Sequence, residues 1–448
     1  MNVVMIITDT MRIDDLGCYG NTFVKTPHLD DLAADAARFG RYYTEGLPTA
    51  PARRAYCTGR FTLPSHGWQP LEPADVLLQE VLWERGYLTA YVSDVYHLFR
   101  EKMGYGRGFG HVHAVRGRET DPWIETGNVA DAVEMYYREP DDGQTLTKWY
   151  TRESYTQYLR NRLPFGAAFG WRHEDDHFET QVVRRAIAWL EHCFHVGLTD
   201  KLYLCVDIFA PHAPIDPPPP YDRMYTRANS RCRDILIPRV GPIAGFCSPQ
   251  EMDHLIKLRA GFVTFVDRCV GDLLNWMRSH KMLDNTLIVY VSDHGDFFGE
   301  HGLLMKCRPW PYDILSHAPM MIRHPKFGRG VAPKTFAQSA DLMPTILDFL
   351  GIPPPKTVQG VSLLPAVRDP DAMLREFAIA GYRNQSESIR NGEWSYYRWL
   401  GGKHEKAGPE LYHLPSDPGE TKSVTAEHLE KAHELDRRLS KFLDGLHG

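Results

Sequence analysis

Short apolar runs that end in polar residues recur along the chain and alternate with segments of helical periodicity. The runs predict strands at 2–8, 88–92, 202–209, 287–291 and, more weakly, 319–322. The periodic segments between them predict helices at 26–37, 75–85, 179–193 and 248–279. Near-continuous apolar strands that alternate with helices are typical of a largely parallel sheet covered on both faces. The pattern therefore predicts an α/β fold, and the polar strand ends favour an enzyme over a scaffold.

The pattern changes near Asp369-Pro370. Beyond it, residues 393–399 alternate like an exposed antiparallel strand, and an amphipathic helix is predicted at about 425–443. We expect residues 1–369 to form the main α/β domain and residues 370–448 a smaller α+β subdomain. The segment 116–178 is rich in aromatic residues and irregular, and we expect an insertion there that covers the functional site.

Composition narrows the class of protein. Of the 448 residues, 43% are hydrophobic and 24% charged, which is the balance of a globular protein. The net charge of −6 comes without a basic stripe, so we expect no nucleic-acid polymer as a partner. No apolar run is long enough to cross a membrane, and the first nine residues resemble a buried strand rather than a signal peptide. The eight cysteines form no C-x-x-C pair, so a cytoplasmic chain without a disulfide framework is expected.

Polar side chains stand where two of the predicted strands end. Asp9 follows the first strand, and Asp293 and His294 follow the fourth. Carboxylates and an imidazole at adjacent strand ends suit a divalent metal ion. Taken singly, Asp9 is more consistent with a turn cap, and 293–295 with an ordinary turn. Their joint occurrence favours a metal site.

A third candidate, Thr49, begins the segment 49–60. Pro51 suits the first turn of a helix and Gly59 its end, which predicts Thr49 at or just before a helix N-terminus. Backbone N–H groups and the helix dipole favour an anion at such a position. A hydroxyl that is bound there to a metal ion could ionise and act as a nucleophile. From the residues alone, an ordinary threonine N-cap is the alternative.

Several separate motifs resemble, in order and spacing, those of the sulfatases of the alkaline phosphatase superfamily. They lie at 7–12, 16–20, 25–30, 49–60, 211–214, 292–302 and 410–420, so the resemblance runs from residue 2 to about 425. It implies an alkaline-phosphatase-like, mixed and mostly parallel sheet sandwiched by helices. It also implies a hydrolase that acts on a small anionic ester. We further expect a homo-oligomer and no membrane partner.

The chain departs from the sulfatase pattern at its nucleophile. Sulfatases carry Cys, or sometimes Ser, in a C-x-P-x-R motif that is oxidised to formylglycine, whereas this chain has Thr49-Ala50-Pro51-Ala52-Arg53. Threonine cannot become that aldehyde, and a threonine ester has to be hydrolysed by attack at its central atom. Phosphorus accepts that attack more readily than a sulfate sulfur. Threonine is also the nucleophile in the superfamily's nucleotide pyrophosphatases and phosphoethanolamine-type transferases.

The resemblance also implies a metal set. One divalent ion, Mn²⁺, Ca²⁺ or Mg²⁺ rather than a zinc pair, would be held by Asp9, Asp293, His294 and the oxygen of Thr49. Many sulfatases have a second Asp directly after the first, and Thr10 stands at that position here. Whether Thr10 contributes to the site is left open.

Supporting residues follow from the same resemblance. Arg53 matches an arginine that steadies the nucleophile; His212 and Lys306 match residues that contact the transferred group and could protonate the leaving oxygen. A surface helix charge, a loop histidine and a solvated lysine are the respective alternatives. The Lys of a sulfatase Lys-x-His pair is missing from 93–97, where Asp94 stands near its place and His97 is a further candidate for contact with the leaving group.

We therefore expect a metal-dependent hydrolase in which Thr49 attacks a phosphorus ester, either a phosphodiester or a phosphonate monoester, and forms a covalent intermediate. A sulfate-ester hydrolase with an unmodified threonine is the alternative. A phosphotransferase and a binding protein without turnover are further alternatives.

Overall fold

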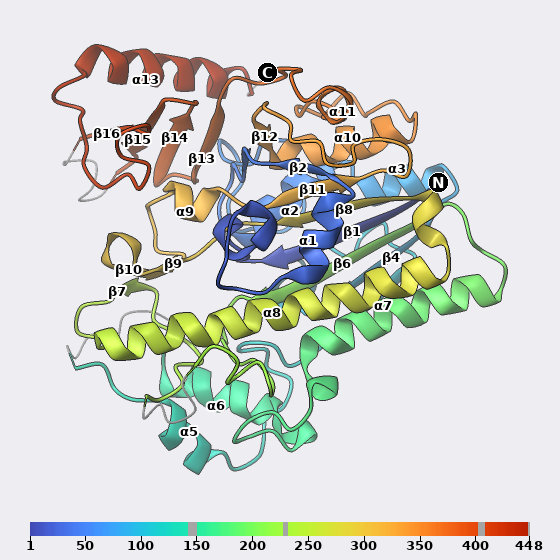
Figure 1. Ribbon diagram of the computed structural model, residues 1–448, viewed down its shortest axis with the longest axis vertical. Coiled ribbons are helices and arrows are strands. Elements are labelled where there is room, and N and C mark those ends of the chain that lie inside the picture. Colours follow the sequence, from blue (N-terminus) through green and yellow to red (C-terminus); the bar gives the residue numbers. More distant parts are fainter. Residues whose placement is uncertain (142–149, 227–231, 402–407, 447–448) are drawn as a thin grey trace.

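A seven-stranded sheet forms the centre of the computed structural model, which describes residues 1–141, 150–226, 232–401 and 408–446. The strand order is β2-β11-β8-β1-β6-β4-β5 (Figure 1). The strands are β1 (Asn2–Asp9), β2 (Ala37–Phe39), β4 (Leu88–Ser93), β5 (His111–Ala114), β6 (Leu202–Pro211), β8 (Thr286–Ser292) and β11 (Met320–Arg323). The strands from β8 to β5 are parallel, and β11 is antiparallel to both of its neighbours. The predicted mixed, mostly parallel sheet is confirmed, with all five predicted strands.

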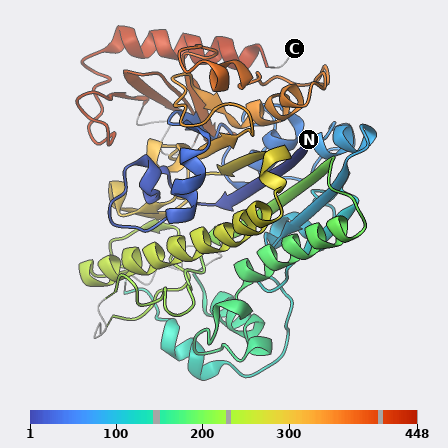
Figure 2. The ribbon, with the colours of Figure 1, turned by 45° about the vertical axis from the view of Figure 1, so that its right-hand side comes forward.

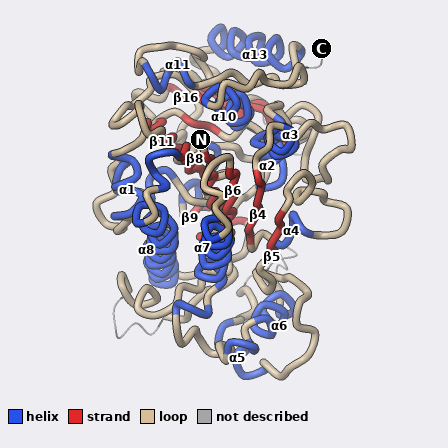
Figure 3. The backbone as a smooth tube through the Cα atoms, turned by 90° about the vertical axis from the view of Figure 1, so that its right-hand side faces the viewer, coloured by secondary structure: helices blue, strands red, loops and turns tan. Residues whose placement is uncertain are grey.

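Two layers of helices cover the two faces of this sheet, as Figure 3 shows end-on. One layer consists of α1 (Pro27–Ala34), α7 (Phe178–His195) and α8 (Pro249–Ser279), and the other of α2 (Thr49–Thr58), α3 (Leu78–Glu84), α10 (Leu342–Phe349) and α11 (Leu364–Arg368). On β1, Val4 and Ile6 belong to the first core, whereas Val3, Met5 and Ile7 belong to the second. Successive side chains of a strand point to opposite faces, so a strand buried on both faces is apolar throughout.

A second sheet near the C-terminus is antiparallel and packs under the last helix. Its strands are β13 (Ala378–Tyr382), β14 (Ser386–Arg390), β15 (Trp394–Trp399) and β16 (Glu410–His413), and the helix is α13 (Leu429–Asp444). The expectation of an exposed strand at 393–399 is wrong, because α13 covers one face of β15 and the main domain covers the other. The smaller α+β part is present, while a domain boundary at 369 stays a prediction.

The segment 116–178 carries α5 (Ala130–Tyr136) and α6 (Arg152–Asn161), which lie at the opposite end of the molecule from α13 (Figures 1 and 2). Asp216 anchors it, because one carboxylate oxygen accepts hydrogen bonds from Tyr158 at 2.7 Å and from Trp171 at 2.8 Å. Residues 142–149 of this segment lie outside the described residues. That the segment covers the functional site stays a prediction.

Short elements complete the fold. They are β3 (Tyr42–Tyr43), α4 (Tyr96–Phe99), β7 (Gly241–Pro242), β9 (Phe297–Phe298), β10 (Leu303–Met305), α9 (Asp313–Ser316) and β12 (Ala337–Gln338). None of the helices in the described part of the chain combines the length and the apolar character that crossing a bilayer requires.

A prediction concerns the contact between α1 and α8. The carboxylate of Asp267 on α8 accepts hydrogen bonds from the main-chain N–H groups of Leu29 at 2.8 Å and His28 at 3.2 Å, at the start of α1. Asp267→Ala leaves these donors without their acceptor, so the free energy of unfolding should fall by about 1–3 kcal/mol. Urea denaturation measures this. Asp272→Ala, at a half-exposed position of the same helix, should change stability by less than about 0.5 kcal/mol. Equal effects of both variants would refute the capping role.

Candidate functional site

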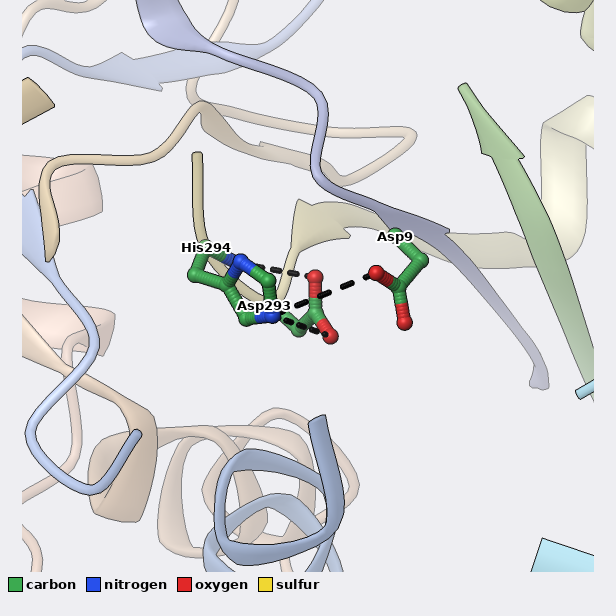
Figure 4. Close-up of side chains that lie close together, drawn as sticks. All are labelled: Asp9, Asp293 and His294. Carbon is green, nitrogen blue, oxygen red and sulfur yellow. Dashed lines mark hydrogen bonds and ion pairs between the residues drawn. The ribbon is translucent and has the colours of Figure 1, made fainter. Parts of the chain in front are cut away.

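Three ligand groups meet at the carboxyl ends of two neighbouring strands. Asp9 ends β1, and Asp293 and His294 directly follow β8, which pairs with β1 in parallel. The Nε2 atom of His294 lies 3.9 Å from Oδ1 of Asp9 and 3.6 Å from Oδ2 of Asp293. Figure 4 shows the three side chains converging, and one ligand atom from each lies within 4.8 Å of the others. The sequence prediction that these residues meet is confirmed.

The charges of this cluster suit a cation. Both carboxylate oxygens of Asp9 are buried without a hydrogen-bond partner in the described part of the chain. Burial, together with the charge of Asp293, raises the pKa of Asp9 well above its usual value. Asp293 is buried too, but His294 and Arg53 lower its pKa to about 2. Two carboxylates that are this close and this buried repel each other, and a divalent ion between them would relieve the repulsion. The residues present therefore fit such an ion.

His294 is held in the state that a metal ligand needs. Its Nδ1 donates a hydrogen bond to the carbonyl oxygen of Gly295 at 2.7 Å, so the lone pair is on Nε2, the atom that faces the carboxylates. Burial and the nearby charge of Lys306 lower the pKa of His294 to about 4, which keeps the ring neutral. The turn also requires glycine at 295, because a Cβ there would lie 2.1 Å from the carbonyl oxygen of Ile314.

Thr49 is the first residue of α2 and is fully buried. Its Oγ1 lies 3.4 Å from Nε2 of His294, at the edge of the cluster. The prediction that Thr49 lies at or just before a helix N-terminus is confirmed. Pro48 occupies the N-cap position, so the alternative of an ordinary threonine N-cap is wrong. The hydroxyl is thus placed where a metal ion and the helix N-terminus would both stabilise an oxyanion.

Arg53, one turn further along α2, is buried beneath the cluster. Its guanidinium binds Asp207 through two hydrogen bonds of 2.9 and 2.7 Å, pairs closely with Asp293, and lies 3.4 Å from Asp9. It also donates to the carbonyl oxygen of Thr49 at 3.4 Å. The alternative of a surface helix charge is therefore wrong. Arg53 therefore links α2, which carries the Thr49 hydroxyl, to the carboxylates of β1, β6 and the end of β8.

Asp207, on β6, is the partner that sequence reasoning missed. The apolar pattern predicts only a strand at 202–209 and no separate role for Asp207 within it. The tyrosine hydroxyl of Tyr91 also donates to it, at 3.0 Å. A signal was available, because Asp207 is the single charge within the buried apolar run of β6, and a charge in such a place needs a partner.

His212 and Lys306 form a pair beside the cluster. Nδ1 of His212 donates to the carbonyl oxygen of Ala213 at 2.6 Å, and Lys306, which follows β10, donates to Nε2 in a close contact. Burial and the charge of Lys306 lower the pKa of His212 well below its usual value. The same lysine charge partly offsets the rise in the pKa of Asp9 that burial and Asp293 cause. The pair can therefore present a proton at the edge of the cluster, and its catalytic role stays a prediction.

His97 lies behind this pair. Its Nε2 is bonded to Glu119 at 2.6 Å, and its ring lies 6.0 Å from that of Phe209, which stacks on His212 at 4.2 Å. A contact between His97 and the leaving group stays a prediction. Thr10 takes part through its main chain, because its N–H donates to Oδ1 of Asp293 at 3.0 Å.

The fold and this carboxylate–imidazole cluster define an ester hydrolase of the alkaline-phosphatase-like class. Residues 1–352 match the family model described as sulfatase, and residues 299–447 match that of the C-terminal part of N-sulphoglucosamine sulphohydrolase. The chain belongs to the sulfatase family, whose enzymes bind a divalent metal ion.

Known relatives and solved structures span nearly the whole chain. The chain is 25% identical to an arylsulfatase of Clostridium perfringens, over 99% of this chain and 94% of the relative. It is 24% identical to an N-acetylglucosamine-6-O-sulfatase of Bacteroides thetaiotaomicron, over 98% and 86%. The structure is similar to the phosphonate monoester hydrolase of Agrobacterium radiobacter, with a TM-score of 0.76 and 22% identity over 100% and 96% of the two chains.

A prediction tests the metal cluster without using activity. Mn²⁺ at about 100 times its dissociation constant should stabilise the wild type against unfolding by about 2.7 kcal/mol. Asp9→Asn and Asp293→Asn should abolish this gain, because each removes one of the charges that the ion would neutralise. Thermal unfolding and titration calorimetry measure both effects. Asp267→Asn, which alters a buried carboxylate elsewhere, should keep the full response. Unchanged Mn²⁺ binding in Asp9→Asn would place the ion elsewhere.

Proposed function

We propose that the protein is a metal-dependent hydrolase of a phosphorus ester, a phosphodiester or a phosphonate monoester, with Thr49 as the nucleophile. The observation that carries this proposal is the hydroxyl of Thr49 at the N-terminus of α2, 3.4 Å from the unprotonated Nε2 of His294. An unmodified threonine there forms a stable ester, which has to be hydrolysed at its central atom. Phosphorus suits that route better than sulfur.

The one cysteine of the same helix does not compete for this role. The thiol of Cys57 lies near the other end of α2 and donates to the carbonyl oxygen of Arg54 at 3.4 Å. Burial and the charge of Asp75 raise its pKa to about 12, so the thiol stays protonated. The hydroxyl at position 49 is therefore the nucleophile that the proposal uses.

In the proposed reaction, the hydroxyl of Thr49 ionises and gives its proton to solvent, and its oxygen then forms a bond to phosphorus while the bond from phosphorus to the leaving oxygen breaks. Lys306 and His212 share a proton that can pass to that leaving oxygen. A water molecule then attacks phosphorus, returns one proton to the pair of Lys306 and His212, and the bond from phosphorus to the oxygen of Thr49 breaks. The N-terminal N–H groups of α2 stabilise negative charge on the transferred group. A divalent ion held by Asp9, Asp293 and His294 would supply Lewis-acid stabilisation of the same charge.

A sulfate-ester hydrolase with an unmodified threonine is the second candidate, because the relatives include proteins named as arylsulfatases and as an N-acetylglucosamine-6-O-sulfatase. The proposal also includes the identity of the ion, which is Mn²⁺, Ca²⁺ or Mg²⁺ rather than a zinc pair. It further includes a cytoplasmic location and a homo-oligomeric state.

A panel of aryl esters tests the class of bond. We expect the purified protein, with Mn²⁺, Ca²⁺ or Mg²⁺, to hydrolyse an aryl phosphodiester or phosphonate monoester faster than the matching aryl sulfate. The reason is that phosphorus accepts in-line attack on the threonine ester. Release of 4-nitrophenol from each ester gives kcat/KM. A large preference for the sulfate over every phosphorus ester would replace the proposal with the second candidate.

Substitution of the nucleophile gives a second test. Thr49→Ala should remove turnover while leaving Mn²⁺ binding and the unfolding midpoint nearly unchanged. Thr58→Ala, at the other end of the same helix, should retain turnover and serves as the control. Mass spectrometry of the wild type, quenched with a slow substrate, should find a phosphate or phosphonate adduct on the peptide that contains Thr49. An adduct on Cys57, or full turnover by Thr49→Ala, would show that Thr49 is not the nucleophile.

A further inference from the structure

A buried arginine of the segment 116–178 contacts the loop that carries His212. The Nη2 group of Arg118 donates to the main-chain carbonyl oxygen of His212 at 3.3 Å and lies 2.9 Å from Oε1 of Glu179. Its guanidinium carbon is 5.8 Å from the centre of the Phe209 ring, and that ring stacks on the imidazole of His212 at 4.2 Å. Arg118 therefore reaches His212 both directly and through Phe209.

Asp94 holds the other end of the same stretch. Its Oδ1 accepts a hydrogen bond of 2.8 Å from the main-chain N–H of Phe209, and its Oδ2 lies 3.9 Å from Nε of Arg118. Both side chains are fully buried. Residues 209–212, the end of β6 and the residue after it, are thus bound at the N–H of Phe209 by Asp94 and at the carbonyl oxygen of His212 by Arg118.

Within the described part of the chain, the hydrogen bonds and ion pairs of Arg118 and Asp94 do not involve Asp9, Asp293 or His294. Their contacts act on the position of one imidazole. A displacement of about 1 Å in a group that transfers a proton can cost up to about 100-fold in rate. We propose that Arg118 and Asp94 are positioning residues, which hold the Nε2 atom of His212 where the proton that it shares with Lys306 can pass to the leaving oxygen. This inference rests on the role of His212 in the proposed function.

The test uses the full-length protein and a series of aryl esters of the acid that the panel identifies, with leaving phenols from acidic to weakly acidic. His212→Ala should slow the esters of weakly acidic phenols most, because these leaving groups need a proton. Arg118→Met should show the same trend, with losses of up to about 100-fold for phenol and within about 3-fold for 4-nitrophenol. The double variant should be no slower than His212→Ala, because both changes act through one group.

Arg162→Met is the matched control. Arg162 belongs to the same segment, is equally buried and pairs with Asp216 at 2.9 Å, not with residues 209–212. It should lower the unfolding midpoint without changing the dependence of kcat/KM on the leaving group. A uniform loss across the series in Arg118→Met, or losses that add to those of His212→Ala, would reduce Arg118 to a structural residue and overturn the proposal.

Asp94 keeps the proposal testable if Arg118→Met does not fold. Asp94→Ala removes the acceptor of the Phe209 N–H and should make kcat/KM depend more steeply on the leaving phenol. Asp94→Asn keeps an acceptor, so its kcat/KM should depend on the leaving phenol as in the wild type. Equal behaviour of these two variants overturns the proposal. An unchanged dependence in His212→Ala overturns the role of His212 itself, and the positioning role with it. In that case the results of the ester panel and the adduct on Thr49 would still support the proposed function. Failure of the positioning role can thus be distinguished from failure of the proposed function.

Discussion

The rest of the site depends on the contacts between the buried guanidinium of Arg53 and three carboxylates. Asp9 ends β1, Asp293 follows the neighbouring β8, and Asp207 lies within the neighbouring β6 opposite Ile7, and Arg53 contacts all three carboxylates inside the protein. Such a group of carboxylates is unstable without a cation, and removal of one partner from a buried ion pair costs about 3–5 kcal/mol. Arg53 supplies the cation from α2. Because Thr49 lies one turn before it on that helix, the same contact fixes the place of the hydroxyl.

The balance of charge around Arg53 leaves a role for a second cation. Three carboxylates lie against Arg53, and the charge of Lys306 also acts on Asp9, so the group keeps one uncompensated negative charge when all five are ionised. A divalent ion among Asp9, Asp293 and His294 would make the net charge positive, which is what an anionic ester needs in order to bind. The neutral state of His294 serves the same end, because a protonated ring would exclude the ion.

The sequence predicted the elements whose residues follow a simple period. Fully apolar strands and long amphipathic helices were predicted because burial on both faces, or on one face, leaves a direct trace in the sequence. Asp9, Asp293 and His294 were predicted because strand ends of a parallel sheet meet at one edge. Asp207 and Arg118 were not, because their roles depend on contacts with residues far away in the sequence, 154 positions for Asp207 and Arg53. The strand at 393–399 was predicted as exposed because alternation alone cannot show that two different layers cover it.

The fold cannot decide between sulfur and phosphorus, because proteins named for both kinds of ester share it. The side chains at the site therefore carry the distinction. Asp94 stands near the place of a lysine in the sulfatase pattern, but it binds the N–H of Phe209 and lies beside Arg118 instead of supplying a charge to the substrate. The lysine of that pattern thus has no counterpart at 93–97. A phosphate monoester carries about −1.5 to −2 charges at neutral pH, whereas a phosphodiester, a phosphonate monoester and a sulfate ester carry one. The sulfatase pattern includes that lysine and acts on a singly charged ester, so the absence of the lysine does not set the charge of the ester. The proposal of a phosphorus ester rests on the threonine at position 49, at the start of α2.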